Sequence, residues 1–583
     1  VVIQRGLDAG FLRMRDGYRG VLEQAVGGRR VFAVVFFAVC LVSMGLVRWV
    51  GEDFFPSVDS GQFKIHLRAH TGTRIEDVAS LCDQVDRTIR ELIPPDELVT
   101  IIDNVGLPYS GINTTYSNSA PIGPADADIQ VSLAAKHRPT PEYVQRLREE
   151  LHRRFPGVTF YELPVDIVTQ ILNFGLPAPL DIQVVGNDLA GNRAWAERVL
   201  DRVKTVAGTA DLRIQQPFDA PALKVEVDRT KALQMGLSQR DVATSLLTAT
   251  SGSFQTAPSF WLNPQNGVSY NIAVQAPQYA MDSLQGLQNI PLAPPSTAAA
   301  NSAARPNAAP ASAASGGSRP TQILSNVASI SRGSAPGTVS HYNIAPAIDI
   351  FGNVVGTDLA SVDAKIERII DAAKKDLPRG SRVFVRGQVQ TMRSSFRGLV
   401  AGLVFSIVLV YLLIVVNFQS WLDPFIIIAA LPFALAGVVW FLFVTATRIS
   451  VPALTGTIMC MGVATSNSIL VVSFAREQLA ELRGDARAAA LSAGFVRFRP
   501  VLMTALAMII GMVPMALGLG DGGEQNAPLG RAVIGGLLFA TVSTLFFVPT
   551  FFHVLHGWLE GRRQRREGGR RAPAVSGDLI HES

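Results

Sequence analysis

The stretch VFAVVFFAVCLVSMGLVRWV (31–50), followed directly by GEDFFPSVDSGQ (51–62), decides how this chain is organised. The first part is an apolar run of about 20 residues, the length that a helix needs to cross a bilayer core. The second part begins a polar block that extends to about residue 397. Five further apolar runs follow, at roughly 398–418, 425–446, 451–474, 500–519 and 532–555. This order predicts six transmembrane helices with one large extramembrane region after the first.

Composition agrees with a mixed membrane protein. The chain has 583 residues, of which 48% are hydrophobic, and it is too long for one soluble domain. Its three cysteines are too few for a disulfide framework. None of the six apolar runs contains an acidic residue. This matters because a proton-driven pump needs a titratable group inside the membrane.

Positive charge is concentrated at the ends of the apolar runs. Arginines collect in the N-terminal segment 1–30, in the linker expected at 475–499 and in the tail 556–583. The positive-inside rule therefore places both termini in the cytoplasm and the polar block across the membrane, in the periplasm of a Gram-negative cell. Nucleic acid is not an expected partner, since the basic flanks are explained by topology.

The chain opens with Val1, and its first apolar run begins only after a basic segment of amphipathic character. No signal peptide is recognisable. We expect the sequence to be a portion of a longer polypeptide.

The polar block begins with a β-α-β-β-α-β pattern, the ferredoxin-like split unit. Alternating apolar residues indicate strands, and apolar residues at helical spacing indicate helices. In order, the expected elements are 62–69 (strand), 74–93 (helix), 98–104 and 126–133 (strands), 140–154 (helix) and 158–163 (strand).

A second ferredoxin-like unit is expected to follow, interrupted by an insertion at about 229–340. Its elements are strand 180–186, helix 189–205, strands 210–215 and 222–227, strand 346–355, helix 359–376 and strand 381–387. The insertion has an expected helix at 238–249, a strand at 268–276 and an Ala/Ser/Pro-rich loop at 294–320.

Several strings together resemble one known family. They are GEDFFPSVDSGQ (51–62), FQSWLDPF (418–425), GVATSNSILVVSFARE (462–477), RFRPVLMTALAMIIGMVPMALG (497–518) and FFVPTFFHVL (546–555). In order, spacing and topology they resemble the C-terminal half of a resistance–nodulation–division (RND) efflux pump of the AcrB-like hydrophobe/amphiphile type, over about residues 8–560.

The resemblance implies an architecture. Residues 56–179 would form porter subdomain 1, residues 180–228 and 341–395 porter subdomain 2, and residues 229–340 a docking (funnel) subdomain. It also implies a homotrimer of the full-length pump in the inner membrane, a separate N-terminal half that supplies an intramembrane acid, a periplasmic adaptor and an outer-membrane channel. The energy source would be the proton motive force, with no cofactor and no enzymatic reaction.

The resemblance also implies a proton relay. Ser466 occupies the position of a family lysine that neutralises a carboxylate pair, while Asn467 and Thr504 match relay residues and Arg497 matches an arginine at the cytoplasmic mouth. A hydroxyl and an amide in place of the lysine would depress the pKa of a facing carboxyl group less. The competing interpretation is that such hydroxyls simply bond to their own helix or to a neighbouring one.

A substrate-pathway loop is implied at 104–111. Ile102, Leu107 and Tyr109 lie where related pumps often carry phenylalanine, and Gly106 and Gly111 would let the loop move. The alternative is an ordinary surface turn.

Metal export is the rival within the family. Residues 52–234 contain no methionine, the ligand that suits soft ions, and His66 and His70 are four residues apart on one expected strand, too far to share an ion without a bend. The main hypothesis is therefore proton-driven export of amphiphilic small molecules. The alternatives are export of divalent metal ions and, in another class, a non-transporting membrane-anchored scaffold or degenerate half-pump.

Overall fold

The computed structural model describes residues 2–107, 121–255, 258–292, 321–482, 484–520 and 522–570. The chain divides into two compact units. The first is Val1–Gln216 together with Val339–Ser583, and the second is Pro217–Thr338. They are described in turn.

Six helices among the described residues of the first unit are long and apolar enough to cross a membrane. This confirms the six predicted spans as helices. Their bounds are Val31–Val50, Gln388–Phe418, Leu422–Val444, Val451–Glu481, Ala486–Ala516 and Ala527–Glu560. The elements that form them are α2 (Arg29–Gly45) with α3 (Val47–Val50), α15 (Gln388–Phe418), α16 (Leu422–Ile428) with α17 (Leu431–Val444), α18 (Val451–Glu481), α19 (Ala486–Ala516), and α20 (Ala527–Val542) with the π-helix η5 (Ser543–Phe547) and α21 (Val548–Arg570). A further helix, α1 (Val2–Gly27), precedes them.

The helices are longer than the apolar runs, and this corrects two predictions. The linker expected at 475–499 is mostly helix, because α18 continues to Glu481 and α19 begins at Ala486. Asp485 caps α19 by accepting hydrogen bonds from the backbone N–H groups of Arg487 and Ala488 at 3.0 and 3.1 Å. The third span begins at Leu422 and so contains Asp423, which means that the spans are not free of carboxylates.

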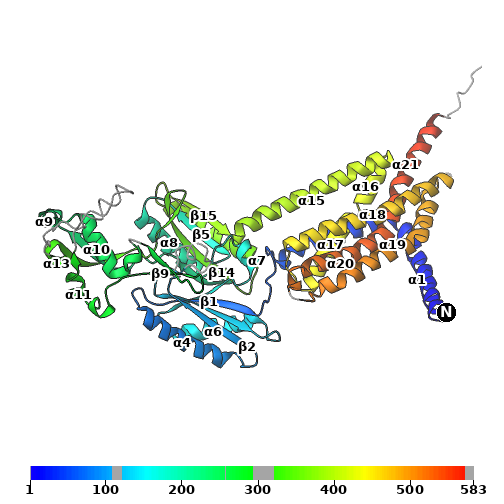
Figure 1. Ribbon diagram of the computed structural model, residues 1–583. Coiled ribbons are helices and arrows are strands. Elements are labelled where there is room, and N and C mark those ends of the chain that lie inside the picture. Colours follow the sequence, from blue (N-terminus) through cyan, green and yellow to red (C-terminus); the bar gives the residue numbers. More distant parts are fainter. Residues whose placement is uncertain are drawn as a thin grey trace, which may run out of the picture. The chain divides into compact units, whose positions relative to one another are not determined.

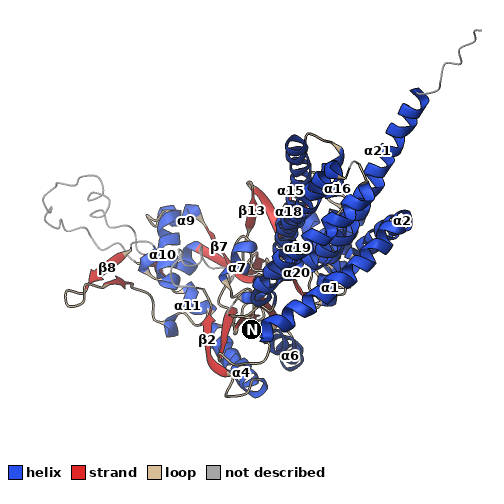
Figure 2. Cartoon of the chain, turned by 90° about the vertical axis from the view of Figure 1, so that its right-hand side faces the viewer, coloured by secondary structure: helices blue, strands red, loops and turns tan. Residues whose placement is uncertain are grey.

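Small residues let α17 and α20 approach closely. A Cβ atom added to Gly437 would lie 2.5 Å from the carbonyl oxygen of Gly535. Close approach through glycine is a common way for membrane helices to associate, since lipid supplies no hydrophobic drive between them. Figure 2 shows α18, α19 and α20 side by side in the resulting bundle.

The first antiparallel sheet has the strand order β2-β3-β1-β4. Its elements follow the predicted β-α-β-β-α-β order: β1 (Gln62–Arg68), α4 (Ile75–Leu92), β2 (Leu98–Val105), β3 (Asp126–Leu133), α6 (Thr140–Arg154) and β4 (Thr159–Leu163). Both helices pack on one face of the sheet (Figure 1) and form a buried core with Phe63, Ile65 and Leu67 of β1. The alternate residues of β1, among them His66 and Arg68, point to the other face.

The second sheet has the order β13-β14-β5-β15, with β6 also paired to β14. Its elements are β5 (Leu180–Val185), α8 (Leu189–Val203), β6 (Thr209–Ile214), β13 (Ser340–Tyr342), β14 (Ala345–Val354), α14 (Leu359–Ala373) and β15 (Arg382–Gly387). Trp195 of α8 is fully buried and donates a hydrogen bond to the carbonyl of Ala373 at 2.8 Å. The short helix α7 (Ile167–Leu172) connects the two sheets along the chain.

One predicted strand belongs elsewhere. The strand expected at 222–227 would be part of this second sheet, but β7 (Ala220–Val227) pairs with β12 (Ala328–Ala335) in the second unit. Eight consecutive residue pairs join β7 to β12, and both strands lie in the second unit, Pro217–Thr338.

The second unit otherwise contains short elements. They are α9 (Arg229–Gln234), α10 (Gln239–Ser251), α11 (Leu284–Gln288), α13 (Leu324–Val327), the hairpin β8 (Ser259–Leu262) with β9 (Ser269–Ile272), and the pair β10 (Pro291–Leu292) with β11 (Gln322–Ile323). The helix predicted at 238–249 is confirmed, and Ser238 caps it in a capping box with Asp241. The loop expected at 294–320 lies outside the described residues.

Candidate functional site

Two of the predicted relay residues meet between neighbouring membrane helices. The hydroxyl of Thr504 in α19 donates a hydrogen bond to the side-chain oxygen of Asn467 in α18 at 3.0 Å. The same hydroxyl lies 3.2 and 3.0 Å from the carbonyl oxygens of Pro500 and Val501 in its own helix. The hydroxyl therefore contacts both a neighbouring helix and its own helix, as the competing interpretation expects, and the relay role of the two residues stays a prediction.

The other two relay candidates lie apart from this contact. Ser466 is exposed on the surface of α18. The guanidinium of Arg497 lies 4.7 Å from the ring centre of Phe474, a cation–π contact. The structure thus brings together Asn467 and Thr504 and does not add Ser466 or Arg497 to them.

Nothing in the sequence predicted a second polar contact, which lies on the same helix. Ser468 of α18 lies within hydrogen-bonding distance of Thr544, with 3.2 Å between the two hydroxyl oxygens, and both residues are 1% exposed. Thr544 belongs to the π-helix η5. Single π-helical turns inside α-helices are rare and often mark functional positions.

The substrate-loop residues are only partly described. Ile102 lies on β2 with half of its surface exposed, and Leu107 is equally exposed. Gly106 has a φ of +78°, and its N–H donates to the carbonyl of Asp126 at 2.7 Å. This glycine therefore has a positive φ, which favours glycine, and the predicted movement of the loop stays a prediction. Tyr109 and Gly111 lie outside the described residues.

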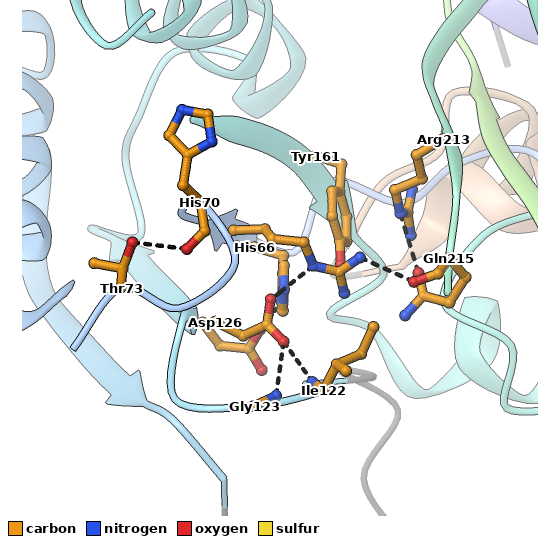
Figure 3. Close-up of polar contacts among 11 residues, drawn as sticks. His66, His70, Thr73, Ile122, Gly123, Asp126, Tyr161, Arg213 and Gln215 are labelled. Carbon is orange, nitrogen blue, oxygen red and sulfur yellow. Dashed lines mark hydrogen bonds and ion pairs between the residues drawn. The ribbon is translucent and has the colours of Figure 1, made fainter. Parts of the chain in front are cut away.

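The sheet face opposite the helices carries a buried polar network (Figure 3). The ring of His66 is fully buried, with Nδ1 2.6 Å from Asp128 and Nε2 3.2 Å from Asp126. Because carboxylates only accept hydrogen bonds, this arrangement is fully hydrogen-bonded when the ring carries both protons. Burial raises the pKa of Asp126, but the hydrogen bond from His66 and the charges of Arg68 and His66 outweigh it and bring that pKa to about 2.

This network reaches residues of the second sheet. Arg68 donates to the carbonyl of Gln215 at 3.0 Å, and the guanidinium of Arg213 lies 3.3 Å from the ring centre of Tyr161. Arg148 of α6 forms a two-pronged ion pair with Asp211, at 2.8 and 3.0 Å. Burial raises the pKa of Asp211, but the hydrogen bond and the charge of Arg148 lower it by more, so that the carboxylate stays charged. Polar and charged contacts therefore join the two sheets.

A large cavity lies beside the first sheet. It has a volume of about 670 Å³ and is lined mainly by the segment 53–63, the stretch 162–173 that includes α7, and parts of 353–359, together with Arg448 and Glu524. Its apolar lining includes Phe54, Phe55 and Leu172. Among the described residues, no methionine, cysteine or histidine lines it.

The cavity is acidic. Of the residues that the structure describes, five carboxylates line it, and Arg448 is the one cation that does so. Arg448 pairs with Asp53 at 2.6 Å, and Glu162 pairs at 3.1 Å with Arg148, which is outside the lining. The other three carboxylates accept hydrogen bonds from uncharged backbone N–H groups: Asp59 from Thr140, Asp166 from Thr169, and Glu524 from Asp59. The described lining therefore keeps a net negative charge.

Metal ligands are not gathered in the described part of the chain, where no group of three or more His, Cys, Asp and Glu side chains could hold an ion. Both ring nitrogens of His66 face carboxylates, and His70 lies beyond the end of β1.

Comparison with known proteins identifies the family. The model of the AcrB/AcrD/AcrF family matches residues 4–556. The chain belongs to this family of RND transporters. This confirms the resemblance to RND transporters that was drawn from the sequence motifs.

Two curated members of the RND family show how far the match extends. The chain is 26% identical over 561 residues to the cation efflux system protein CzcA of Alcaligenes sp. (strain CT14), covering 94% of this chain and 49% of that protein. It is also 26% identical over 552 residues to the multidrug resistance protein MdtC of Serratia proteamaculans, with the same coverage. The chain thus spans about half the length of the curated relatives it matches.

A solved structure supports the RND fold. The crystal structure of a heavy metal efflux pump, in crystal form II, superposes with a TM-score of 0.76 at 22% identity, covering 94% of this chain and 52% of that one. At this identity the likeness concerns the fold alone.

Proposed function

We propose that this chain is the C-terminal half of a proton-driven exporter of the inner membrane, and that it moves cationic amphiphilic molecules from the periplasm or the membrane to an outer-membrane channel. The observation that carries the substrate class is the cavity, which combines apolar walls with a net negative charge and has no soft metal ligand in its described lining. A cation with an apolar body gains both burial and charge complementarity there.

In this proposal the two sheets are ferredoxin-like porter subdomains, and the second unit is the docking subdomain. The pump works as a homotrimer with a periplasmic adaptor, and its other half supplies the acid that faces Asn467 and Thr504. Proton binding in the membrane shifts the balance between conformations of the porter subdomains, as any ligand does when it binds one state better.

A second candidate, export of hard divalent cations, is favoured by the names of relatives such as the cation efflux protein CzcA. The carboxylates of the cavity are oxygen ligands, which suit such ions.

Transport by the complete pump in a strain without other exporters separates these candidates. We expect efflux of a lipophilic quaternary ammonium dye, and Glu524→Gln should raise the KM for the dye while leaving an uncharged analogue of similar size unaffected. Glu197→Gln is the matched control, because Glu197 lies outside the cavity and pairs with Arg193 on the surface. Efflux of zinc or cobalt ions without the dye would replace this proposal with the second candidate. No efflux of either would favour the scaffold alternative.

A further inference from the structure

The third membrane span carries a buried acid close to its start. Asp423 lies in the first turn of α16, and 2% of its surface is exposed. A carboxylate inside a membrane span is costly, rare and usually functional. It belongs neither to the cavity nor to the contact between Asn467 and Thr504.

Two basic side chains from other spans approach this carboxylate. The imidazole of His556 in α21 places its Nε2 2.9 Å from one carboxylate oxygen. A guanidinium nitrogen of Arg476 in α18 lies 3.6 Å from the other oxygen. The same nitrogen of Arg476 makes its short contact, 2.6 Å, with the carbonyl oxygen of Phe418. The imidazole is therefore a direct hydrogen-bonding partner of Asp423, and Arg476 adds a more distant positive charge.

Histidine is the side chain whose charge ordinarily changes between about pH 5 and about pH 8. Because Nε2 is held by Asp423, the neutral ring is favoured as the Nε2–H tautomer, and the exchangeable proton is the one on Nδ1. His556 keeps 16% of its side chain exposed and Arg476 keeps 47%. An open hollow of about 390 Å³ lies beside Arg476 and Phe418. The edge of the cluster is therefore partly exposed while the carboxylate stays buried.

The remaining titratable groups on the surrounding helices have other placements. Tyr411 of α15 donates to the carbonyl of Trp421, and Tyr18 of α1 donates to that of Leu545. On α1, Arg15 pairs with Asp16 and Arg19 with Glu23. The other described charged or titratable side chains on these helices near this end are Arg13 of α1, Glu477 and Glu481 of α18, Arg487, Arg497 and Arg499 of α19, and His553 and Glu560 of α21.

We propose that Asp423 and His556 form a proton-exchanging pair at the end of the bundle where the basic segments gather. His556 takes up and releases a proton at Nδ1, while its Nε2–H stays hydrogen-bonded to the Asp423 carboxylate. Arg476 contributes a positive charge 3.6 Å from the other carboxylate oxygen. The pair gives this half of the protein a proton site of its own, separate from the predicted relay, and its use in transport rests on the proposed function.

The test is ¹⁵N NMR of the whole chain in lipid nanodiscs with labelled histidine, which distinguishes the doubly protonated ring from each neutral tautomer. The His556 signal is assigned by its loss in His556→Gln. We expect Nδ1 to lose its proton between about pH 5 and about pH 8 while Nε2 keeps its own. Asp423→Asn should weaken this tautomer preference, because the asparagine amide can present either its oxygen or its NH2 group to Nε2. His553→Gln, one turn earlier on the same helix, should remove a different signal and leave that of His556 unchanged.

A ring that stays in one protonation state over this range would overturn the proposal, and so would an unchanged tautomer preference in Asp423→Asn. If Asp423→Asn does not fold, Asp423→Glu keeps the charge and should keep the Nε2–H tautomer. The measurement reads the chain itself, so it can succeed or fail independently of any transport assay.

Discussion

Asp126→Asn should lower the stability of the first sheet by an amount that follows from the pKa of Asp126. Burial raises the pKa of Asp126, but the contacts with His66 and Arg68 bring it down to about 2, from an ordinary value of 3.8. The difference, 3.8 minus about 2, corresponds to about 2 kcal/mol of stability at neutral pH. Because the folded pKa is depressed, this stability is present above pH 3.8 and is lost as the pH falls toward 2, with about half remaining at about pH 3.

Hydrogen exchange read by mass spectrometry can follow this sheet within the whole chain. At neutral pH, peptides covering β1 and β3 should exchange about 30-fold faster in Asp126→Asn than in the wild type, if they open by local unfolding. At about pH 3 the ratio should fall to about tenfold or less. Asp371→Asn is the control, because Asp371 is exposed and pairs only with Lys374 among the described residues. A change below about threefold at neutral pH, or a ratio that does not depend on pH, would refute this account of the network.

Three further predictions concern other parts of the chain. Burial and the nearby charge of Asp349 raise the pKa of Asp181 well above 3.8. The stability linked to the protonation of Asp181 is therefore present at low pH and is lost as the pH rises. In Asp181→Asn, the amides of β5 should exchange more slowly than in the wild type at about pH 8 but not at about pH 4. Gly106→Ala should destabilise the β2–β3 pairing by about 1–2 kcal/mol, because φ is +78° and the new Cβ would lie 3.0 Å from Ile75. The control is Gly123→Ala, because the space around Gly123 is open. Equal hydrogen exchange of β2 and β3 in both variants would contradict the prediction. Thr504→Val should lower stability by only about 0.6 kcal/mol, the typical value of an interhelical hydrogen bond in a membrane. It should nevertheless reduce proton-coupled efflux by the complete pump at least about tenfold, whereas Thr504→Ser should keep that efflux. Normal efflux in Thr504→Val would exclude the relay role.

The family motifs could be interpreted from the sequence because they lie in long segments with strong local patterns. Asn467 and Thr504 were singled out because both residues belong to such motifs, whereas the hydrogen bond between them was not predicted. His556 was different: as a residue close to the end of the last apolar run, it had no feature that distinguished it from an ordinary interfacial histidine. Its partner Asp423 comes just before the third apolar run as judged from hydropathy, and only the start of the helix at Leu422 brings it into the span.

The sequence by itself determined the six spans, the order of strands and helices in the first sheet and the family, because apolar length, the period of two or 3.6 residues and motif spacing are local properties. The tertiary structure alone decided the partner of β7, the two carboxylates around His66, the acidic cavity and the pairing of Asp423 with His556. The residues of these contacts are far apart in the chain: β7 pairs with β12 about a hundred residues later, and Asp423 lies 133 residues before His556. No local pattern encodes which distant polar groups will be buried together, since that depends on how the finished elements pack.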